Sequence, residues 1–295
     1  MRRVEVHGFA DDADAVRRLA EGLGVAHALV DLRTFPDGET LPTVATTGAD
    51  TVILLRSLFP ANARLVPLLL AADAYRRTGV KRLTLAAPYL CYLRQDTVFE
   101  AGQPLSRDVV CRWLGEAFDR LVTVQAHLHR TTDLAAVLGI RADNIDIGAD
   151  LAALAVRDGP PLIVGPDSES RPWVEAAARR LGGDWTVFAK QRLGDRRVAL
   201  TLDSAARIAG RNVLLLDDIC SSGGTLEQAT LMLRQAGAAR VDIAVAHALF
   251  DAAAEARLRR AGADRIVSSD SVPHSTNALD LAGVLAAALR DEIPA

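Results

Sequence analysis

The sequence predicts an α/β fold in which parallel sheets are covered by helices on both faces. Short runs of β-branched and other apolar residues alternate along the chain with longer amphipathic, alanine-rich segments. This alternation is typical of βαβ units, whose crossover helices pack on the faces of a parallel sheet. Half of the 295 residues are hydrophobic, so the chain can bury a sizeable core, and its length suits one large or two medium domains.

The individual elements follow from this alternation in chain order. The strand candidates are RVEVHGF, TVILLRS, RLTLAAP, RLVTVQA, PLIVGP, WTVFAK, NVLLLDD, RVDIAVAHAL and DRIVSSD. The helix candidates are DADAVRRLAEGL, NARLVPLLLAADAYRRTG, SRDVVCRWLGEAF, TDLAAVL, RPWVEAAARRLGG, GTLEQATLMLRQAG, AAAEARLRRAG and NALDLAGVLAAALR. The polar stretch RADNIDIG, near residues 140 to 148, has no strong period, and we interpret it as a linker. We therefore predict two similar domains, 1–143 and 144–295, with the C-terminal helix free to pack back on the first.

Composition argues against several classes of protein. The formal net charge is −3 and the basic residues are spread along the chain, so we expect no nucleic-acid partner. No apolar stretch reaches the roughly 18 residues of a membrane helix, and no apolar run follows the first arginines, so we expect neither a membrane span nor a signal peptide. The three cysteines lie far apart without metal-binding spacing, which favours a reducing cytoplasm.

Two adjacent acids end one of the predicted strands. Asp217 and Asp218 follow the apolar run VLLL and precede the small-residue loop CSSGGT. Ligands of open α/β sheets bind at the carboxyl ends of strands, and glycine-rich turns at helix starts favour phosphate. The acids can accept hydrogen bonds from hydroxyl groups or face a cation, so the segment predicts a sugar-phosphate site. The alternative is an ordinary turn between a strand and a helix.

Further polar segments follow other predicted strands. The long segment APYLCYLRQDTVFEAGQPLSRD contains Arg94, which can bind phosphate, or it is a solvated loop. The turn TFPDGET is a weak signal by itself. His127 and His129 in VQAHLHR suit a metal or an anion as well as a structural role.

Two more segments carry charge at predicted strand ends. Asp167 in IVGPDSES is either a Mg²⁺ ligand or a helix N-cap. Lys190 and Arg192 in FAKQRLGDRR suit a mobile cationic loop over an anionic transition state, or a basic surface loop.

Taken together, these segments resemble the ribose-phosphate pyrophosphokinases, also called PRPP synthetases. FPDGE, PYLCYLRQD with GQPLS, the histidine after VTV, GPD, AKQR and DDICSSGGT occur in the family's order over nearly the whole chain. The resemblance implies two similar type I phosphoribosyltransferase-like domains, each a mainly parallel sheet flanked by helices. It also implies transfer of the diphosphoryl group of ATP to ribose 5-phosphate, a requirement for Mg²⁺, and a homo-oligomer of at least two subunits, because the family's ATP site is shared between subunits.

The resemblance also implies roles for particular residues. The catalytic residues are Lys190, Arg192 and His127. The ATP-binding residues are Phe35, Asp37, Glu39, Arg94, Gln95 and Asp96. The ribose 5-phosphate-binding residues are Asp217, Asp218, Ser221, Ser222, Gly223, Gly224 and Thr225. The Mg²⁺ ligands are His127 and Asp167.

The chain departs from the family pattern at several positions, which keeps alternatives open. Gln125 stands where the family usually has an acid, and Ser168, Glu169 and Ser170 replace its glycines. The alternatives are a related enzyme with another diphosphoryl donor or sugar phosphate, a phosphoribosyltransferase that consumes PRPP, and a non-catalytic regulatory homologue. The presence of both the RQD and the KxR segments argues against the PRPP-consuming enzyme, and the intact acid pair and KxR segment argue against the regulatory homologue.

Overall fold

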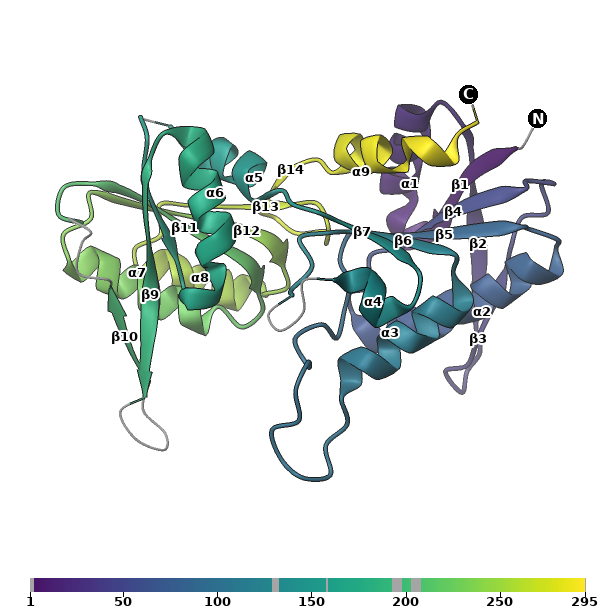
Figure 1. Ribbon diagram of the computed structural model, residues 1–295, viewed down its shortest axis with the longest axis horizontal. Coiled ribbons are helices and arrows are strands. Elements are labelled where there is room, and N and C mark those ends of the chain that lie inside the picture. The colour runs from purple at the N-terminus through teal and green to yellow at the C-terminus, as the bar shows by residue number, and fades with distance from the viewer. Residues whose placement is uncertain (1–2, 129–132, 158, 193–197, 203–207, 295) are drawn as a thin grey trace. The chain divides into compact units, whose positions relative to one another are not determined.

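A computed structural model describes residues 3–128, 133–157, 159–192, 198–202 and 208–294, with backbone alone for 189–192 and 198–202. The chain divides into two compact units. Unit 1 comprises Met1–Ile145 together with Leu281–Ala295, and unit 2 comprises Asp146–Asp280. Each unit contains a mainly parallel sheet with helices on both faces, which confirms the predicted fold class (Figure 1). No helix in the described part of the chain is long and apolar enough to cross a membrane.

The described residues of unit 1 form a seven-stranded sheet in the order β3-β2-β1-β4-β5-β6-β7. The strands are β1 (Val4–Phe9), β2 (Ala26–Thr34), β3 (Thr40–Thr43), β4 (Thr51–Leu55), β5 (Arg82–Ala87), β6 (Arg120–Val124) and β7 (Arg141–Ile145). All neighbours are parallel except the β2–β3 hairpin. The central strands β1, β4 and β6 are buried along their whole length, as expected for strands covered on both faces.

Helices cover the two faces of this sheet. On one face lie α1 (Ala13–Leu23) and the C-terminal α9 (Ala282–Leu289), which pack against each other. On the other lie α2 (Ala61–Arg77), α3 (Ser106–Ala117) and α4 (Leu134–Leu138) (Figure 1). The approach of α1 to the sheet requires Gly8, because a Cβ there would lie 2.4 Å from Val16 Cγ2 and 2.8 Å from the carbonyl oxygen of Leu55.

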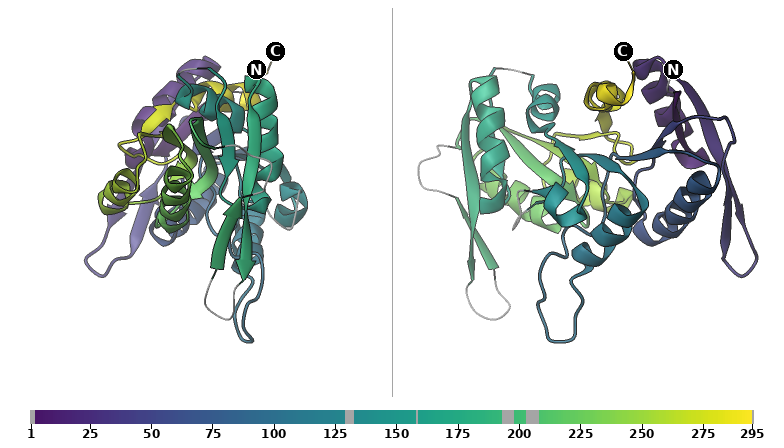
Figure 2. Two further views of the ribbon diagram at one scale, coloured as in Figure 1. Left: turned by 90° about the vertical axis from the view of Figure 1, so that its left-hand side faces the viewer. Right: turned by 45° about the vertical axis from the view of Figure 1, so that its right-hand side comes forward.

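Unit 2 repeats this topology in its described residues. Its sheet has the order β10-β9-β8-β11-β12-β13-β14, and only the β9–β10 pair is antiparallel. The strands are β8 (Leu162–Gly165), β9 (Asp184–Arg192), β10 (Val198–Leu202), β11 (Asn212–Cys220), β12 (Arg240–Ala248), β13 (Arg265–Ser269) and β14 (Asn277–Leu279). The helices α5 (Gly148–Ala155) and α6 (Arg171–Leu181) lie on one face, and α7 (Gly224–Gln235) and α8 (Ala252–Arg260) on the other (Figure 1). The β9–β10 hairpin projects from the body of the unit (Figure 2).

The structure corrects two sequence-based assignments and adds four elements that were not predicted. The segment RADNIDIG was interpreted as a linker, yet Arg141–Ile145 forms the edge strand β7, paired in parallel with β6. An edge strand is partly exposed and carries polar side chains, so the period that identifies buried strands is missing. The segment NALDLAGVLAAALR was predicted as one helix, but it begins as the short strand β14. The strands β2, β3 and β10 and the helix α5 were not predicted as such.

Candidate functional site

The order of strands directs attention to the same place in both units. In unit 1, β1 lies between β2 and β4, and in unit 2, β8 lies between β9 and β11. From β1 and from β8, the chain adds strands first on one side of the sheet and then on the other. Ligands of open α/β sheets bind at such a switch point, outside the carboxyl ends of the strands. The predicted site residues of both units follow or end strands at this edge.

In unit 2, the paired acids lie at the carboxyl end of β11. The strand was expected to end with Asp218, but it continues to Cys220 because β12 is equally long and pairs with it as far as Ala248. Asp217 and Asp218 are both half-buried, and the N–H of Asp218 donates to Asp217 Oδ1 over 3.0 Å. The acids therefore lie within a strand that pairs with β12 on both sides of Asp218, rather than in a flexible turn.

The environment of Asp217 disfavours its charge. Burial raises the pKa of Asp217 well above the usual value, and the neighbouring carboxylates of Asp218 and Asp167 raise it further. Asp167 follows β8, which pairs with β11, so three carboxyl groups converge at one edge of the sheet. Such a group is stabilised by hydroxyl donors or by a cation.

We expect Asp217→Asn to raise the melting temperature by roughly 2 °C at about pH 7. The folded-state pKa of Asp217 lies above its unfolded-state value, so ionisation at neutral pH opposes folding. The stabilisation should vanish below the unfolded-state pKa of about 3.9, where the carboxyl group is protonated in both states. Thermal unfolding of both proteins at neutral and acid pH checks this, and an unchanged or lower melting temperature at neutral pH would contradict it.

The loop after β11 leads directly into a helix. Ser221, Ser222, Gly224 and Thr225 are exposed, and Gly223 has a left-handed backbone with φ of 79° at the N-cap of α7. No side chain described in the structure caps this helix. The first N–H groups of α7 are therefore available at an exposed helix start, and helix N-termini are common binding sites for phosphate groups.

Asp167 occupies the turn after β8. Its side chain accepts a hydrogen bond from the N–H of Glu169, and its carbonyl oxygen accepts one of 2.6 Å from Ser170 Oγ. The chain needs glycine at position 165, because a Cβ there would lie 1.9 Å from Ser170 Oγ. Glu169 is exposed. The capping interaction leaves Asp167 half-buried at the edge of the sheet, so the structural and metal-binding interpretations are compatible.

The basic pair lies on the projecting hairpin. The backbone of Lys190 and Arg192 belongs to β9, and these residues pair with Leu200 and Val198 of β10. Their side chains lie outside the described part of the structure, as does the whole of His129.

In unit 1, the turn Phe35–Glu39 connects β2 to β3. The N–H of Phe35 donates to the carbonyl oxygen of Glu39 over 2.8 Å, and Asp37 Oδ1 accepts the N–H of Glu39 over 3.0 Å. The guanidinium of Arg33 stacks on the Phe35 ring at 4.5 Å. Asp37 and Glu39 are exposed, so this turn presents two carboxylates and an aromatic ring at the tip of a hairpin.

The segment between β5 and α3 has neither helix nor strand, as predicted, and extends from unit 1 (Figure 1). Arg94 and Gln95 are exposed and Asp96 is half-buried. The carbonyl oxygen of Gln95 accepts the N–H of Arg107 at the start of α3, which ties the exposed residues to a helix. This contact limits the freedom of an otherwise irregular loop.

His127 lies just beyond β6 and is half-buried. The preceding Gln125 has a φ of 43°, and its N–H donates to the carbonyl oxygen of Ile145 over 2.8 Å. The N–H of Ala126 donates to Asn144 Oδ1. The end of β6 is thus bound to the end of β7, which fixes the backbone leading to His127.

The structure adds residues that sequence reasoning did not single out. His247 lies at the end of β12 opposite Ile219, is buried, and has Nδ1 2.8 Å from Ser271 Oγ. Arg56 follows β4 and is 1% exposed. Both could have been found by aligning the ends of neighbouring strands, because each is a polar residue directly after an apolar run.

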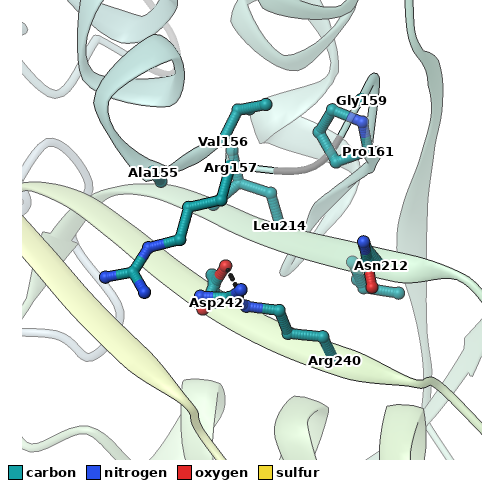
Figure 3. Close-up of a pocket in the computed structure, with 10 residues that line it drawn as sticks. Ala155, Val156, Arg157, Gly159, Pro161, Asn212, Leu214, Arg240 and Asp242 are labelled. Atoms are coloured by element: carbon teal, nitrogen blue, oxygen red, sulfur yellow. Dashed lines mark ion pairs between the residues drawn. The ribbon is translucent and has the colours of Figure 1, made fainter.

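A small cavity at the opposite edge of the unit 2 sheet is not a candidate site. It is about 10 Å³ in volume and is lined by residues such as Val156, Asn212 and Asp242 (Figure 3). Arg240 Nε is 2.8 Å from Asp242 Oδ2, so these two lining residues form an ion pair with each other. The cavity has room for about one water molecule.

No group of three or more His, Cys, Asp or Glu side chains poised to hold a metal ion occurs among the described residues. The converging carboxyl groups of Asp167, Asp217 and Asp218 nevertheless offer hard oxygen donors, which Mg²⁺ prefers. The raised pKa of Asp217 means that a cation at this edge would relieve carboxylate repulsion. These oxygens are of the kind that Mg²⁺ prefers, and the phosphate groups of a bound substrate would have to supply further ligands.

The repeated topology and the phosphate-favouring helix start define a protein built from two phosphoribosyltransferase-like units. Residues 142–282 match the phosphoribosyl transferase domain, and residues 8–117 match the N-terminal domain of ribose phosphate pyrophosphokinase. The ribose-phosphate pyrophosphokinase of Pyrococcus furiosus is 32% identical over 83% of this chain and 86% of its own. That of Methanopyrus kandleri is 33% identical over 93% of this chain and 94% of its own. The chain therefore belongs to the ribose-phosphate pyrophosphokinase family, which confirms the resemblance seen in the sequence.

A solved structure agrees with this assignment at the level of the fold. The crystal structure of phosphoribosylpyrophosphate synthetase from Mycobacterium smegmatis is similar with a TM-score of 0.83 and 24% sequence identity. The similarity covers 98% of each chain. The two-unit architecture is thus shared over essentially the whole length.

Proposed function

We propose that the protein is a ribose-phosphate diphosphokinase, which transfers the β,γ-diphosphoryl group of ATP to the 1-hydroxyl of ribose 5-phosphate and releases AMP and PRPP. Membership of the ribose-phosphate pyrophosphokinase family supports this reaction. The observation that carries it is the acid pair Asp217 and Asp218 at the end of β11, followed directly by the exposed start of α7. A sugar phosphate offers hydroxyls to the acids and its phosphate to the helix start.

In the proposed reaction, the 1-hydroxyl oxygen attacks the β-phosphorus of ATP. The O1–Pβ bond forms while the bond from Pβ to the α,β-bridging oxygen breaks, and AMP leaves with that oxygen. The hydroxyl proton is released. Asp217 and Asp218 hold the sugar hydroxyls and orient O1, and Lys190 and Arg192 neutralise the charge that develops on the transferred group.

The remaining roles complete the site. The ATP-binding residues are Phe35, Asp37, Glu39, Arg94, Gln95 and Asp96. The 5-phosphate binds the loop formed by Ser221, Ser222, Gly223, Gly224 and Thr225. His127 and Asp167 are the proposed Mg²⁺ ligands, and His127 also lies among the catalytic residues. When bound, Mg²⁺ supplies charge neutralisation on the phosphate groups.

We also propose a homo-oligomer of at least two subunits in the cytoplasm. The turn Phe35–Glu39 stands at the tip of a hairpin, where it can reach a second subunit. Exposed apolar side chains on β2 and β3, namely Leu29 and Leu41, support self-association. Cys91 and Cys111 are buried and form no disulfide with any described residue, which supports a reducing compartment.

The test is a coupled measurement of AMP and PRPP after incubation with ATP, ribose 5-phosphate and Mg²⁺. We expect equal amounts of both products, and we expect Lys190→Ala to lower kcat by about 100- to 1,000-fold. Absence of AMP with every common nucleotide donor, while ribose 5-phosphate still binds, would contradict the proposal.

That outcome would favour a second candidate, a non-catalytic regulatory homologue. The departures at Gln125 and Glu169 favour it most directly, because Glu169 is an exposed acid two residues after a proposed metal ligand. A positive reaction with a different donor or sugar phosphate would instead indicate the related enzyme with altered substrates.

A further inference from the structure

Unit 1 contains a large pocket at the carboxyl edge of its sheet, and the roles proposed above account only for Asp37 and Glu39 at its rim. The pocket has a volume of about 1000 Å³ and lies between the β2–β3 hairpin and the first turns of α2. Its lining includes Arg56, Asn62, Arg64, Val66 and Leu70. The volume is at the upper end of the range for small-molecule sites, and the position is the one where open α/β sheets bind ligands.

Arg56 is the most unusual residue in this pocket. It is 1% exposed, and its guanidinium lies 3.6 Å from the centre of the Phe9 ring. Its Nε and Nη1 are fully buried and have no hydrogen-bond partner among the described residues. Its nearest carboxylate oxygen, Asp12 Oδ2, is 3.7 Å from Nη1. A buried guanidinium without hydrogen bonds is costly, and an anion offsets this cost.

Asp12 does not satisfy Arg56 because it is already bound to another arginine. Arg64 Nη1 donates to both carboxylate oxygens of Asp12, over 2.8 and 3.0 Å, and to the carbonyl oxygen of Ser57. Burial lowers the pKa of Arg56 to about 10, with Asp12 acting in the opposite direction. The side chain remains charged at neutral pH, and its charge is only partly balanced by the protein.

The start of α2 provides a second group of anion-binding donors beside Arg56. The helix begins after Pro60, and no side chain in the described residues caps its first N–H groups. Pro60, Asn62, Ala63 and Arg64 all line the pocket, so the first turn of a 17-residue helix faces it. The carboxylates of the lining come from other segments: Asp11 after β1, and Asp37 and Glu39 in the β2–β3 turn.

The repeated topology gives this pocket a counterpart in unit 2. Gly8 of β1 pairs with Leu55 of β4, and Arg56 comes next. In unit 2, Val164 of β8 pairs with Leu215 of β11, so Leu216 lies opposite Gly165 as Leu55 lies opposite Gly8. The residue after Leu216 is Asp217. Arg56 thus occupies the place of Asp217, and α2 occupies the place of α7. At the carboxyl edge of the sheet, an acid precedes α7 in unit 2, whereas a cation precedes α2 in unit 1.

We propose that the unit 1 pocket binds a small molecule through a phosphate group, which Arg56 and the first turn of α2 hold. The apolar wall of Val66, Pro67 and Leu70 contacts the body of the ligand. This site is separate from the loop at α7, and its occupation does not depend on the proposed reaction.

Isothermal titration of the full chain with inorganic phosphate, and separately with AMP, tests the site without turnover. We expect Arg56→Gln to weaken the binding of at least one probe about tenfold or more and to remove one site from the stoichiometry. Arg77→Gln is the matched control, because it removes the same charge from the exposed end of α2 and should leave binding unchanged. Binding at the α7 loop contributes equally to every variant.

A second variant makes the result independent of the stability of Arg56→Gln. Val66 is 58% exposed, so Val66→Glu places a carboxylate on the pocket wall without disturbing the core. It should also weaken the Arg56-dependent site. An effect with inorganic phosphate indicates a free anion as ligand, and an effect confined to AMP indicates an organic phosphate; both support the site. Wild-type affinity and stoichiometry in Val66→Glu, or in a folded Arg56→Gln, would overturn it.

Discussion

Asp218→Ala is expected to lower kcat/KM for ribose 5-phosphate by about 100- to 1,000-fold, because charge-assisted hydrogen bonds contribute about 1.5–3 kcal/mol each. The proposed role of Asp218 is to accept hydrogen bonds from the sugar hydroxyls together with Asp217. Asp218 lies within β11, between Asp217 and Ile219, which pair with Val245 and His247 of β12. The loss should therefore come from the missing carboxylate rather than from a displaced loop. Steady-state kinetics with ribose 5-phosphate as the varied substrate measures it.

The control for this experiment is Glu175→Ala, which removes an exposed acid of unit 2 that pairs with Arg179 on α6. It should retain wild-type kinetics within about twofold. A similar loss in both variants would indicate a general effect of charge or stability. A normal KM and kcat in Asp218→Ala would refute the proposed role of the acid pair in binding the sugar hydroxyls.

The candidate site could be predicted from the sequence where one short segment contains all of its parts. The acids, the small residues and the helix start of unit 2 are consecutive, so the apolar run before Asp217 was enough to place them at a strand end. Arg56 shows the opposite case. It follows a strand in the same way, but its significance depends on Asp12, Arg64 and the helix start around it, and only the folded chain brings these together.

The strands of the fold show the same contrast between what the sequence predicts and what only the folded chain reveals. Strands buried on both faces, such as β4 and β6, are continuous apolar runs and were recognised from the sequence. The edge strands β3, β7 and β14 were not, because an edge strand is defined by its neighbour in the sheet rather than by its own composition. The β2–β3 hairpin is a clear example, since its turn was recognised while its exposed strands lacked a buried pattern.

We expect Arg120→Ala to lower the free energy of unfolding of unit 1 by about 3–5 kcal/mol, because it breaks a buried ion pair and leaves carboxylates uncompensated. Arg120 is 1% exposed and bonds three acids: Asp143, Asp291 and Glu292. It also donates to the carbonyl oxygen of Ala288 over 2.9 Å. Through these contacts, β6 holds the C-terminal helix and the segment after it against the sheet.

Arg141→Ala is the matched control for this prediction. Arg141 donates to the same Asp291 over 2.7 Å, but it is 54% exposed, so its loss should cost less than about 1 kcal/mol. Trp113 lies in unit 1, whereas Trp173 and Trp185 lie in unit 2. Denaturant unfolding followed by fluorescence, in a chain with Trp173→Phe and Trp185→Phe, therefore reports unit 1 alone. Equal costs for the two arginines would contradict the argument from burial.

The pH dependence distinguishes a lost ion pair from lost packing. Burial opposes the charge of Glu292, but hydrogen bonds from Arg82 and Arg120 outweigh it and hold the pKa of Glu292 below its usual value. A carboxylate with a lowered folded-state pKa stabilises the fold above its unfolded-state pKa, and this stabilisation is lost as the pH falls through the folded-state pKa. The stability difference between wild type and Arg120→Ala should therefore be full at neutral pH and shrink below about pH 4. A difference that stays constant into acid would mean that Arg120 acts through the packing of its side chain, because protonation of Glu292 leaves that packing in place.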